Sequence, residues 1–504
     1  MARWGLLALL LLAAAGAGGA KARKDKARRK EKDPSPAPPE ENICDLQSEF
    51  NVYCYCNTPE PRNATESTCW TLRAEDPDDP VWDVFRTQPS LEKLMFNSRP
   101  DSRLWFVPTR ALTHLPKLRV LDVKYANIPE LAPHAFANLT SLRELSLSRC
   151  SIVTLRPHSV ARLPALAVAS LDENRIAEIP RGVFVALPEL RKLYIARNNL
   201  SVVHDKAFAH LRRLEELELC DNQLTAVSRD TFAGLRSLAR LDLHQNHISL
   251  LGDYVFAEMP NLEEIDVDLN GLEAVGERAF AGLRKLGRLS IAENRLAVLG
   301  GSVFAHTPSL HHLDLRDNHL RTLVIDTVSP LLDNLKNVST YFYVEGNNFV
   351  CDCRLSWMYA LRNETPNEQV RNALEELTCV VEPADVEAVA DAATLEADAA
   401  GTTEGRGGYP RDQPRDEAPG TSTGPPPAAA AAAAAVRKHL FEIPAEDLPC
   451  PENLQLNRDP LAEVEFGSGL KLGQGLTGKS AGGVAIAGHL AAILAAILGV
   501  SLVT

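Results

Sequence analysis

The residues of this chain best suited to covalent or metal chemistry are its cysteines. The ten cysteines fall into two clusters and two isolated residues. The clusters comprise Cys44, Cys54, Cys56 and Cys69 near the start, and Cys351, Cys353, Cys379 and Cys450 near the end. In a secreted chain such clusters indicate disulfide bonds. Zinc binding is the alternative for the first cluster, but its spacing repeats no CxxC knuckle. We therefore expect oxidised cysteines there.

Catalytic motifs are the second kind of chemistry that a sequence can reveal. The 504 residues contain no nucleophile elbow, phosphate-binding loop, HExxH or paired catalytic motif. The formal net charge of −13 argues against a nucleic-acid partner. We expect a protein that is not an enzyme, uses no cofactor and binds no nucleic acid.

The start of the chain is typical of a secreted protein. Residues 1–20 combine Arg3, the apolar run Leu6–Ala17 and small residues, which is the pattern of a signal peptide. An N-terminal membrane anchor is the alternative, but the apolar run is shorter than the roughly 20 residues that span a bilayer. We predict that residues 1–20 are removed on secretion.

A basic segment follows the signal peptide. Residues 21–32 contain eight Lys or Arg, and we expect 21–43 to be a disordered linker. The same charge could bind a sulfated glycan. A processing site near Arg28 and Arg29 is a third interpretation.

The end of the chain carries the pattern of a glycosylphosphatidylinositol (GPI) anchor signal. Small and polar residues, Gly467–Gly483, precede the apolar tail Val484–Thr504. We predict attachment at Ser480, removal of 481–504 and a stalk over 451–480. A transmembrane helix is the alternative, but no cationic flank is present to orient it.

The elements that hold these residues follow from an internal repeat. Each copy has apolar residues at positions 1, 4, 6 and 11 and usually Asn at position 9. The copies start 24 residues apart, at Leu118, Leu142, Leu166, Leu190, Leu214, Leu238, Leu262, Leu286 and Leu310. This period and pattern are the signature of leucine-rich repeats. For 91–344 we predict an α/β-type solenoid, a leucine-rich repeat horseshoe with a parallel concave β-sheet, built from these nine copies and degenerate ends.

Positions within a repeat should have distinct structural roles. Positions 3 to 8 should form one strand, with 4 and 6 inward and 5 and 7 outward. A Phe at position 19 should stack in a second row of the core, at Phe136, Phe184, Phe208, Phe232, Phe256, Phe280 and Phe304. The position-9 amides should satisfy the backbone from inside, at Asn174, Asn198, Asn222, Asn246, Asn270, Asn294 and Asn318.

Partner binding in this architecture belongs to the outward positions 2, 3, 5, 7 and 8. The predicted binding residues are Arg143, Arg149, Arg191, Lys192, Arg197, Glu216, Glu218, Asp242, Glu264 and Asp266. They give the concave face a basic amino half and an acidic middle. Such a face could dock an antiparallel copy of itself, because complementary charge steers encounter and register. Ordinary solvated charge is the alternative.

The remaining candidates for chemistry lie inside the repeats. Asp266-x-Asp268-x-Asn270 suggests calcium, but Asn270 should point inward, so we predict no metal site. Cys150, at position 9, should be a buried thiol, and Cys220, at position 7, should be exposed on the concave face. Three repeats separate the two cysteines by about 14–15 Å, beyond the roughly 7 Å limit for a disulfide. Cys220 should be a free thiol; a glycan-shielded thiol and an intermolecular bridge are the alternatives.

The flanking clusters resemble the cysteine-rich caps of extracellular leucine-rich repeat proteins. C-x9-C-x-C-x12-C precedes the repeats, and CxC followed by Trp357 succeeds them. This resemblance implies caps over 44–90 and 345–450, the second with a disordered insertion at about 385–436. Pairing of first with third and second with fourth implies the disulfides Cys44–Cys56, Cys54–Cys69, Cys351–Cys379 and Cys353–Cys450.

Together these segments resemble the cell-surface leucine-rich repeat adhesion family, and within it the GPI-anchored connectin-type proteins of insects. The phrase Cys54-Tyr55-Cys56-Asn57 also points to that branch. The resemblance implies homophilic cell–cell adhesion during neuromuscular development, on the outer leaflet of the plasma membrane. Two alternatives remain: a co-receptor that holds a soluble factor for a transmembrane signalling partner, and a shed matrix component that binds sulfated glycans through 21–32.

Glycosylation is a further expectation for a secreted chain. Asn-x-Ser/Thr sequons begin at Asn63, Asn138, Asn199, Asn337 and Asn363. By its phase in the repeat, Asn138 should lie on the return side and leave the concave face open.

Overall fold

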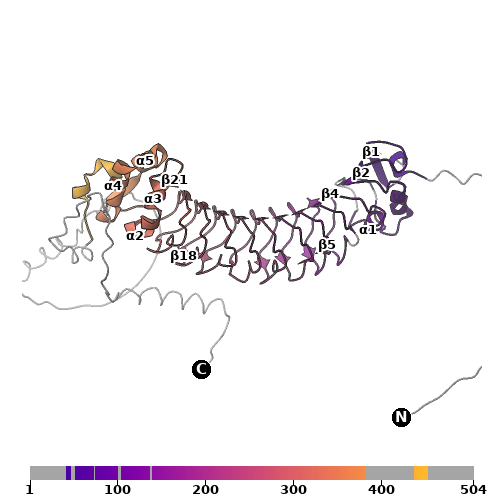
Figure 1. Ribbon diagram of the computed structural model, residues 1–504, viewed down its shortest axis with the longest axis horizontal. Helices are drawn as coiled ribbons and strands as arrows, with labels where there is room; N and C mark the ends of the chain where they lie inside the picture. Colours follow the sequence, from indigo (N-terminus) through magenta and orange to yellow (C-terminus); the bar gives the residue numbers. More distant parts are fainter. Residues whose placement is uncertain are drawn as a thin grey trace, which may run out of the picture. The chain divides into compact units, whose positions relative to one another are not determined.

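The computed structural model describes residues 41–46, 51–72, 74–99, 104–136, 139–381 and 436–451. The chain divides into a unit 1–449 and a unit 450–504, and the fold described below belongs to the first. Its frame is one 13-stranded sheet that lines the concave side of a solenoid (Figure 1). The predicted leucine-rich repeat horseshoe is confirmed.

The main sheet takes one strand from each repeat and two from the amino cap. Its order is β1 (Val52–Cys56), β2 (Glu66–Thr71), β3 (Lys93–Ser98), β4 (Val120–Lys124), β6 (Glu144–Ser148), β9 (Val168–Ser170), β12 (Lys192–Tyr194), β14 (Glu216–Glu218), β15 (Arg240–Asp242), β17 (Glu264–Asp266), β19 (Arg288–Ser290), β20 (His312–Asp314) and β21 (Tyr341–Tyr343). The pair β1–β2 is antiparallel and the others are parallel. Equivalent positions of neighbouring repeats therefore stand side by side.

Most repeat strands are shorter than the predicted positions 3 to 8. From β9 onward they cover positions 3 to 5, and the backbone then turns through a residue of positive φ at position 8, such as Arg197 (54°) or Asp221 (53°). Hydrogen bonds between repeats continue past the strand, as from Ile195 N–H to the Glu218 carbonyl at 2.9 Å. The turn ends the strand early because it redirects the chain to the return side.

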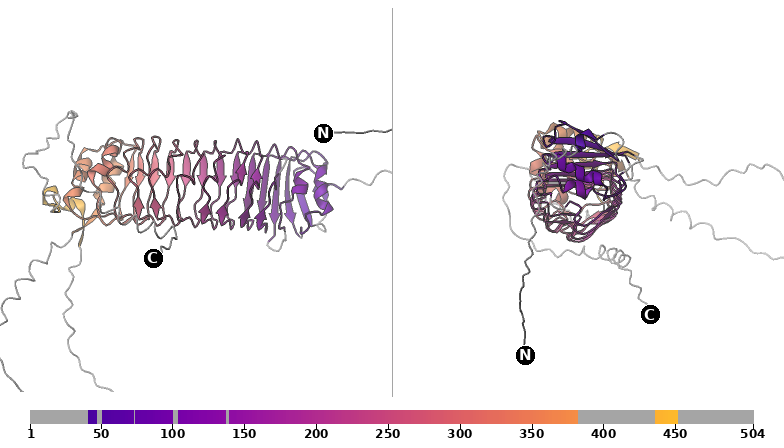
Figure 2. Two further views of the ribbon diagram at one scale, coloured as in Figure 1. Left: turned by 90° about the horizontal axis from the view of Figure 1, so that it is seen from below. Right: turned by 90° about the vertical axis from the view of Figure 1, so that its right-hand side faces the viewer.

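The return side consists of turns and two-residue strands. These are β5 (Glu130–Leu131), β7 (Thr154–Leu155), β8 (Val160–Ala161), β10 (Glu178–Ile179), β11 (Phe184–Val185), β13 (Val202–Val203), β16 (Leu250–Leu251) and β18 (Ala274–Val275). They pair as β5–β7, β8–β11, β10–β13 and β16–β18, all parallel. In the end-on view of Figure 2, successive repeats lie behind one another and share one cross-section.

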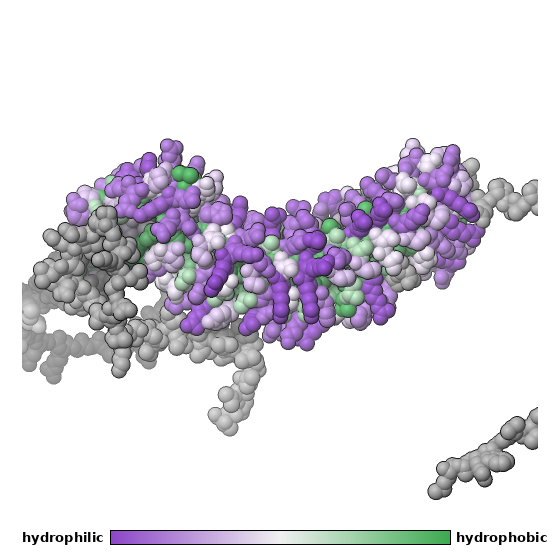
Figure 3. Space-filling model, in the orientation of Figure 1, coloured by the Kyte–Doolittle hydropathy of each residue, from purple (hydrophilic) through white to green (hydrophobic). Residues whose placement is uncertain are grey.

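Two rows of side chains hold the repeats together, as predicted. The buried phenylalanines stack at 5.9 Å between Phe256 and Phe280 and at 6.1 Å between Phe232 and Phe256. The asparagines donate to buried backbone carbonyls, and this row extends one rung beyond the prediction, to Asn347. At the first rung Cys150 is fully buried, and its thiol donates to the Val123 carbonyl at 3.2 Å. Because these apolar side chains lie inside, the side of the solenoid seen in Figure 3 is mostly hydrophilic.

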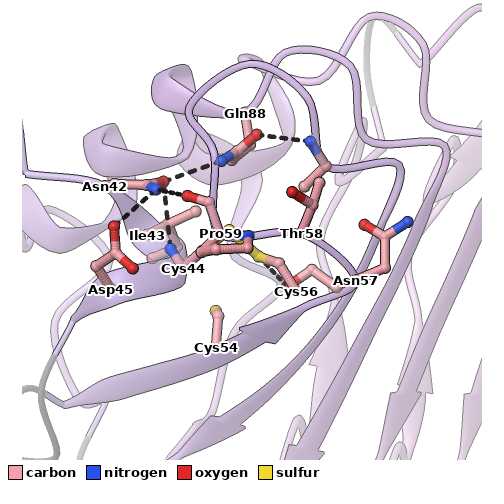
Figure 4. The surroundings of a disulfide bond; sticks show 12 residues. Asn42, Ile43, Cys44, Asp45, Cys54, Cys56, Asn57, Thr58, Pro59 and Gln88 are labelled. Atoms are coloured by element: carbon pink, nitrogen blue, oxygen red, sulfur yellow. Dashed lines mark hydrogen bonds between the residues drawn. A yellow bond between two sulfur atoms is a disulfide. The ribbon is translucent and has the colours of Figure 1, made fainter.

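The amino cap closes the first end of the sheet. The structure contains the disulfides Cys44–Cys56 and Cys54–Cys69, the pairs that the family resemblance implies. Buried Asn42 ties the segment around the first disulfide together. Its amide donates to Asp45 and to the Pro59 carbonyl, and it accepts from Gln88 Nε2 at 3.0 Å (Figure 4). Helix α1 (Thr109–Leu112) and the 3-10 helix η2 (Pro80–Thr87) lie against each other beneath the strands.

The remaining α-helices lie toward the carboxyl end. The last repeat contains α2 (Ile325–Val328) and α3 (Leu332–Leu335), and the carboxyl cap contains α4 (Trp357–Glu364) and α5 (Glu368–Glu375). The disulfide Cys351–Cys379 is present, and Cys353 and Cys450 are each disulfide-bonded. Strand β22 (Thr378–Val381) pairs with β23 (Val436–His439), so the chain does return to the cap after the insertion.

Candidate functional site on the concave face

The outward side chains of positions 3, 5 and 7 form three parallel rows on the sheet, which together we call the concave face. The rows arise because inward and outward residues alternate along each strand. In β15, for example, Leu241 is buried between Arg240 and Asp242, which point outward. Register aligns each row with its neighbours, so a side chain contacts the residue 24 positions away.

Position 3 carries a ladder of alternating charge. Lys192 Nζ lies 2.7 Å from a Glu216 carboxylate oxygen, and Arg240 lies 3.0 Å from the other oxygen. The ladder continues from Arg240 to Glu264 at 3.0 Å and from Glu264 to Arg288 at 3.3 Å. Each carboxylate therefore stands between two cations.

Glu216 is the most enclosed member of this ladder, with 8% of its surface exposed. Burial opposes ionisation of the carboxyl, but the hydrogen bond and charge of Lys192 and the charge of Arg240 outweigh it. The pKa of Glu216 is consequently lowered. A lowered pKa keeps the ladder charged at neutral pH.

Ion pairs with carboxylates neutralise most of the predicted basic half. Arg149 lies 2.6 Å from Glu173, Arg197 lies 3.5 Å from Asp221, and Arg191 pairs with Glu215. Lys192 pairs with Glu216, as described above. In the described part of the chain, Arg143 is the one residue of the five without an ion pair.

The predicted acidic middle persists in positions 5 and 7. Burial, followed by neighbouring carboxylates, raises the pKa of Glu218 and Asp266. Burial and the charge of Asp266 raise the pKa of Asp268 to about 6. Asp268 also accepts from Ser290 Oγ at 2.7 Å. Negative charge is therefore concentrated along the centre of the face.

The Asp266-x-Asp268-x-Asn270 sequence does not converge on a common point. The Asn270 amide donates inward to the carbonyls of Leu243 and Val267, at 3.0 and 3.1 Å. Asn270 belongs to the internal ladder, as its position predicted.

Cys220 is not exposed as predicted, since only 7% of its surface is accessible. Position 7 does place Cys220 on the outward side, but the longer side chains beside it cover it. Asp242 and His244, on the next repeat, extend over the short cysteine side chain and bring their polar atoms close to its sulfur. His244 Nδ1 lies 2.7 Å from an Asp242 carboxylate oxygen.

Aromatic residues mark the amino end of the concave face, a feature that sequence analysis missed. Tyr53 and Trp70 face each other across β1 and β2, with ring centroids 6.1 Å apart, and Tyr55 is exposed beside them. We call Tyr53, Tyr55 and Trp70 the amino-end cluster. Alternation in β1 and β2 around the buried cysteines was the signal that could have located it.

A second aromatic group marks the carboxyl end. His312, Tyr341 and Tyr343 lie within 5.5–6.3 Å of one another by ring centroid. The guanidinium of Arg316 lies 4.9 Å from the Tyr343 centroid. We call these four residues the carboxyl-end cluster.

The remaining predicted sites are the glycosylation sequons and the segments near the two ends of the chain. Asn63, Asn199, Asn337 and Asn363 are exposed. Asn138, the basic segment 21–32, the signal peptide and the anchor signal with Ser480 lie outside the described residues. Within the described part, no helix is long and apolar enough to cross a membrane.

Comparisons with known proteins agree with this architecture. The "Leucine rich repeat" family model matches six overlapping segments, 100–152, 140–200, 164–219, 188–248, 236–296 and 260–320. Connectin of Drosophila melanogaster is 43% identical over 65 residues, which cover 13% of this chain and 10% of connectin. The chain thus aligns with about a tenth of that relative's length.

Solved structures that match part of the chain include two protein complexes. The mouse RP105/MD-1 complex matches with 21% identity and a TM-score of 0.49, over 62% of this chain and 52% of the matched chain. The Drosophila Toll–Spatzle complex matches with 17% identity and a TM-score of 0.43, over 60% and 50% respectively. In both cases the chain spans about half the length of the matched protein.

Proposed function

This chain is a leucine-rich repeat protein related to connectin, and from that premise we propose that it is a cell-surface adhesion protein that binds a second copy of itself on an opposing cell. The observation that carries the proposal is the pair of aromatic clusters at the two ends of one continuous face. A GPI anchor at Ser480 and a role in neuromuscular development belong to the same proposal.

The positions of the clusters favour an antiparallel pair. A two-fold interface is isologous, so the amino-end cluster of each copy would meet the carboxyl-end cluster of the other. Tyr, Trp and Arg are the residues that dominate the energetics of protein interfaces. Trp70 and Tyr341 are each exposed over more than a third of their surface, so both are available for such contacts.

Charge and curvature are compatible with this pairing. The ion-paired ladder at position 3 presents no net basic or acidic half to a second copy. The acidic middle would repel its counterpart, but two concave faces that meet at their ends keep their centres apart (Figure 1). The contacts would therefore concentrate where the aromatic residues lie.

Cell aggregation tests the proposal directly. Cells that do not normally adhere would express the full-length chain with one dye and be mixed with non-expressing cells carrying another. We expect aggregates of expressing cells only, dispersed by phosphatidylinositol-specific phospholipase C. Displayed protein that does not aggregate cells would exclude homophilic adhesion and favour the co-receptor alternative. Aggregates that resist the lipase would exclude the lipid anchor but leave homophilic adhesion in place.

Matched variants test the surface. Trp70→Ala combined with Tyr341→Ala should reduce aggregation at least tenfold, because hot-spot aromatics each contribute about 2 kcal/mol or more. Tyr254→Ala is the control, since Tyr254 is as exposed as Tyr341 (41% against 40%) but lies on the return side. Equal aggregation by both variants at equal surface display would exclude the end clusters as the contact.

A further inference from the structure

Three side chains of different chemical type converge at the centre of the concave face, and the proposed adhesion does not use them. Cys220 Sγ, a carboxylate oxygen of Asp242 and a ring nitrogen of His244 all lie within 4.8 Å of one another. We infer that these three residues bind a divalent transition-metal ion, and that zinc is the ion their chemistry fits best. The site is independent of the proposed adhesion.

Zinc is favoured by the combination of donors. Thiolate, imidazole and carboxylate are the three protein ligands that Zn²⁺ takes, and a tetrahedral ion bound by three of them keeps one open position. Calcium and magnesium prefer oxygen ligands alone. The open position would face the solvent on the concave side, where water or a group from a partner could complete the coordination.

The backbone holds the donors in place before any ion binds. Glu218 and Asp242 are register partners in β14 and β15, so Cys220 and His244, two residues further along, also stand side by side. The Asp221 N–H donates to the His244 carbonyl at 3.1 Å, and the Leu219 N–H donates to the Asp242 carbonyl at 2.9 Å. Donors fixed by neighbouring strands are well placed to form a site without rearrangement of the chain.

The distances suit a tetrahedral ion. Zinc–ligand bonds of about 2.0–2.3 Å place the donors about 3.3–3.8 Å apart. The His244 and Asp242 atoms, now 2.7 Å apart in a hydrogen bond, would separate slightly. All other separations lie below 4.8 Å and would close by rotation of side chains.

The state of the Cys220 thiol is a second, independent indication. More than nine-tenths of Cys220 is buried, yet among the described residues its thiol donates a hydrogen bond to no acceptor. The other free cysteine, Cys150, donates to the carbonyls of Val123 and Ser148. Buried polar groups normally have partners, and a metal ion would supply one for Cys220.

The surroundings also attract a cation. Asp242 stands in a row of carboxylates at position 5, between its register partners Glu218 and Asp266. Within the described part of the chain no arginine or lysine is ion-paired with Asp242. A divalent ion at the site would balance part of the negative charge of this row.

Cobalt substitution tests the site, because Co²⁺ bound to a thiolate gives a near-ultraviolet sulfur-to-metal charge-transfer band. The full-length protein, purified in detergent and stripped of metal with a chelator, would be titrated with Co²⁺ and then with Zn²⁺. We expect the band to saturate at one equivalent, with visible bands of tetrahedral intensity, and to disappear as Zn²⁺ displaces Co²⁺. Absence of the band, or saturation only at several equivalents, would overturn the inference.

Variants identify the ligands. Cys220→Ser should abolish the band, and His244→Gln should weaken Co²⁺ binding at least tenfold, since changes beyond the direct ligands alone already cost about 10–100-fold. Cys150→Ala is the control and should keep the band, because Cys150 is the other free thiol. Circular dichroism would establish that each variant is folded. A band that survives Cys220→Ser in folded protein, or that Cys150→Ala removes, would refute the assignment.

Discussion

The asparagine ladder yields the sharpest test of how the repeats are held together. Asn222 is almost fully buried and accepts from the Leu200 N–H at 3.0 Å. Its amide donates to the carbonyls of Ile195, Leu219 and Cys220, at 2.9, 3.1 and 3.0 Å. Asn222→Ala removes all four hydrogen bonds at once.

The cost of this change depends on which groups keep another partner. The Leu219 carbonyl also accepts from Asn246, the Ile195 carbonyl from Asn198 and the Cys220 carbonyl from the Arg197 N–H. The Leu200 N–H has no second acceptor among the described residues. One orphaned buried donor costs about 1–3 kcal/mol and the weakened acceptors add to it. We expect Asn222→Ala to lower the free energy of unfolding by about 2–4 kcal/mol.

Urea denaturation followed by circular dichroism measures this loss. With a slope of about 3 kcal/mol per molar urea, the midpoint should fall by about 1 M. Gln223→Ala is the control, because Gln223 is the next residue and is exposed, and its effect should stay within about 0.5 kcal/mol. Equal shifts for the two variants would refute the assignment of the ladder as a source of stability.

Three further predictions concern the core and the charged rows. Phe256→Ala should lower the free energy of unfolding by about 3–5 kcal/mol, because Phe256 is buried and stacks on both neighbouring rings. Thermal unfolding would show this loss as a lower midpoint, whereas Tyr254→Ala, at an exposed site, should change the midpoint little. Glu216→Gln should cost about 1–2 kcal/mol in the free energy of unfolding, between the values for exposed and buried ion pairs, because the cations it leaves are half-exposed. Lys192 pairs with Glu216, so Lys192→Met in the same chain should add little further loss, and additive losses would contradict the assignment. The raised pKa of Asp268, about 6, means that the folded state binds more protons than the unfolded chain between the ordinary carboxyl pKa and 6. Urea midpoints should therefore rise from pH 7 to pH 5, and Asp268→Asn should reduce that rise; an unchanged rise in the variant would show that other groups cause it.

The repeat, its core and the residues inside it could be predicted from the sequence alone. The period of 24 residues assigns Phe256 and Asn222 to the interior. In a solenoid each repeat packs only on its neighbours, so local pattern and global fold carry the same information. The disulfides Cys44–Cys56, Cys54–Cys69 and Cys351–Cys379 could be predicted for a different reason, since they rest on resemblance to known caps.

The proposed binding face could be predicted only in part. Outward positions were assigned correctly, but the basic half was not a free surface, since Glu173 and Glu215 neutralise Arg149 and Arg191. The burial of Cys220, its convergence with Asp242 and His244, and the carboxyl-end cluster appeared only in three dimensions. The physical reason is that strands about 4.8 Å apart place side chains from different repeats within reach of one another. The sequence determined which residues point outward, and only the tertiary structure decided which of them meet, because that depends on the register, length and rotamer of neighbours 24 residues away.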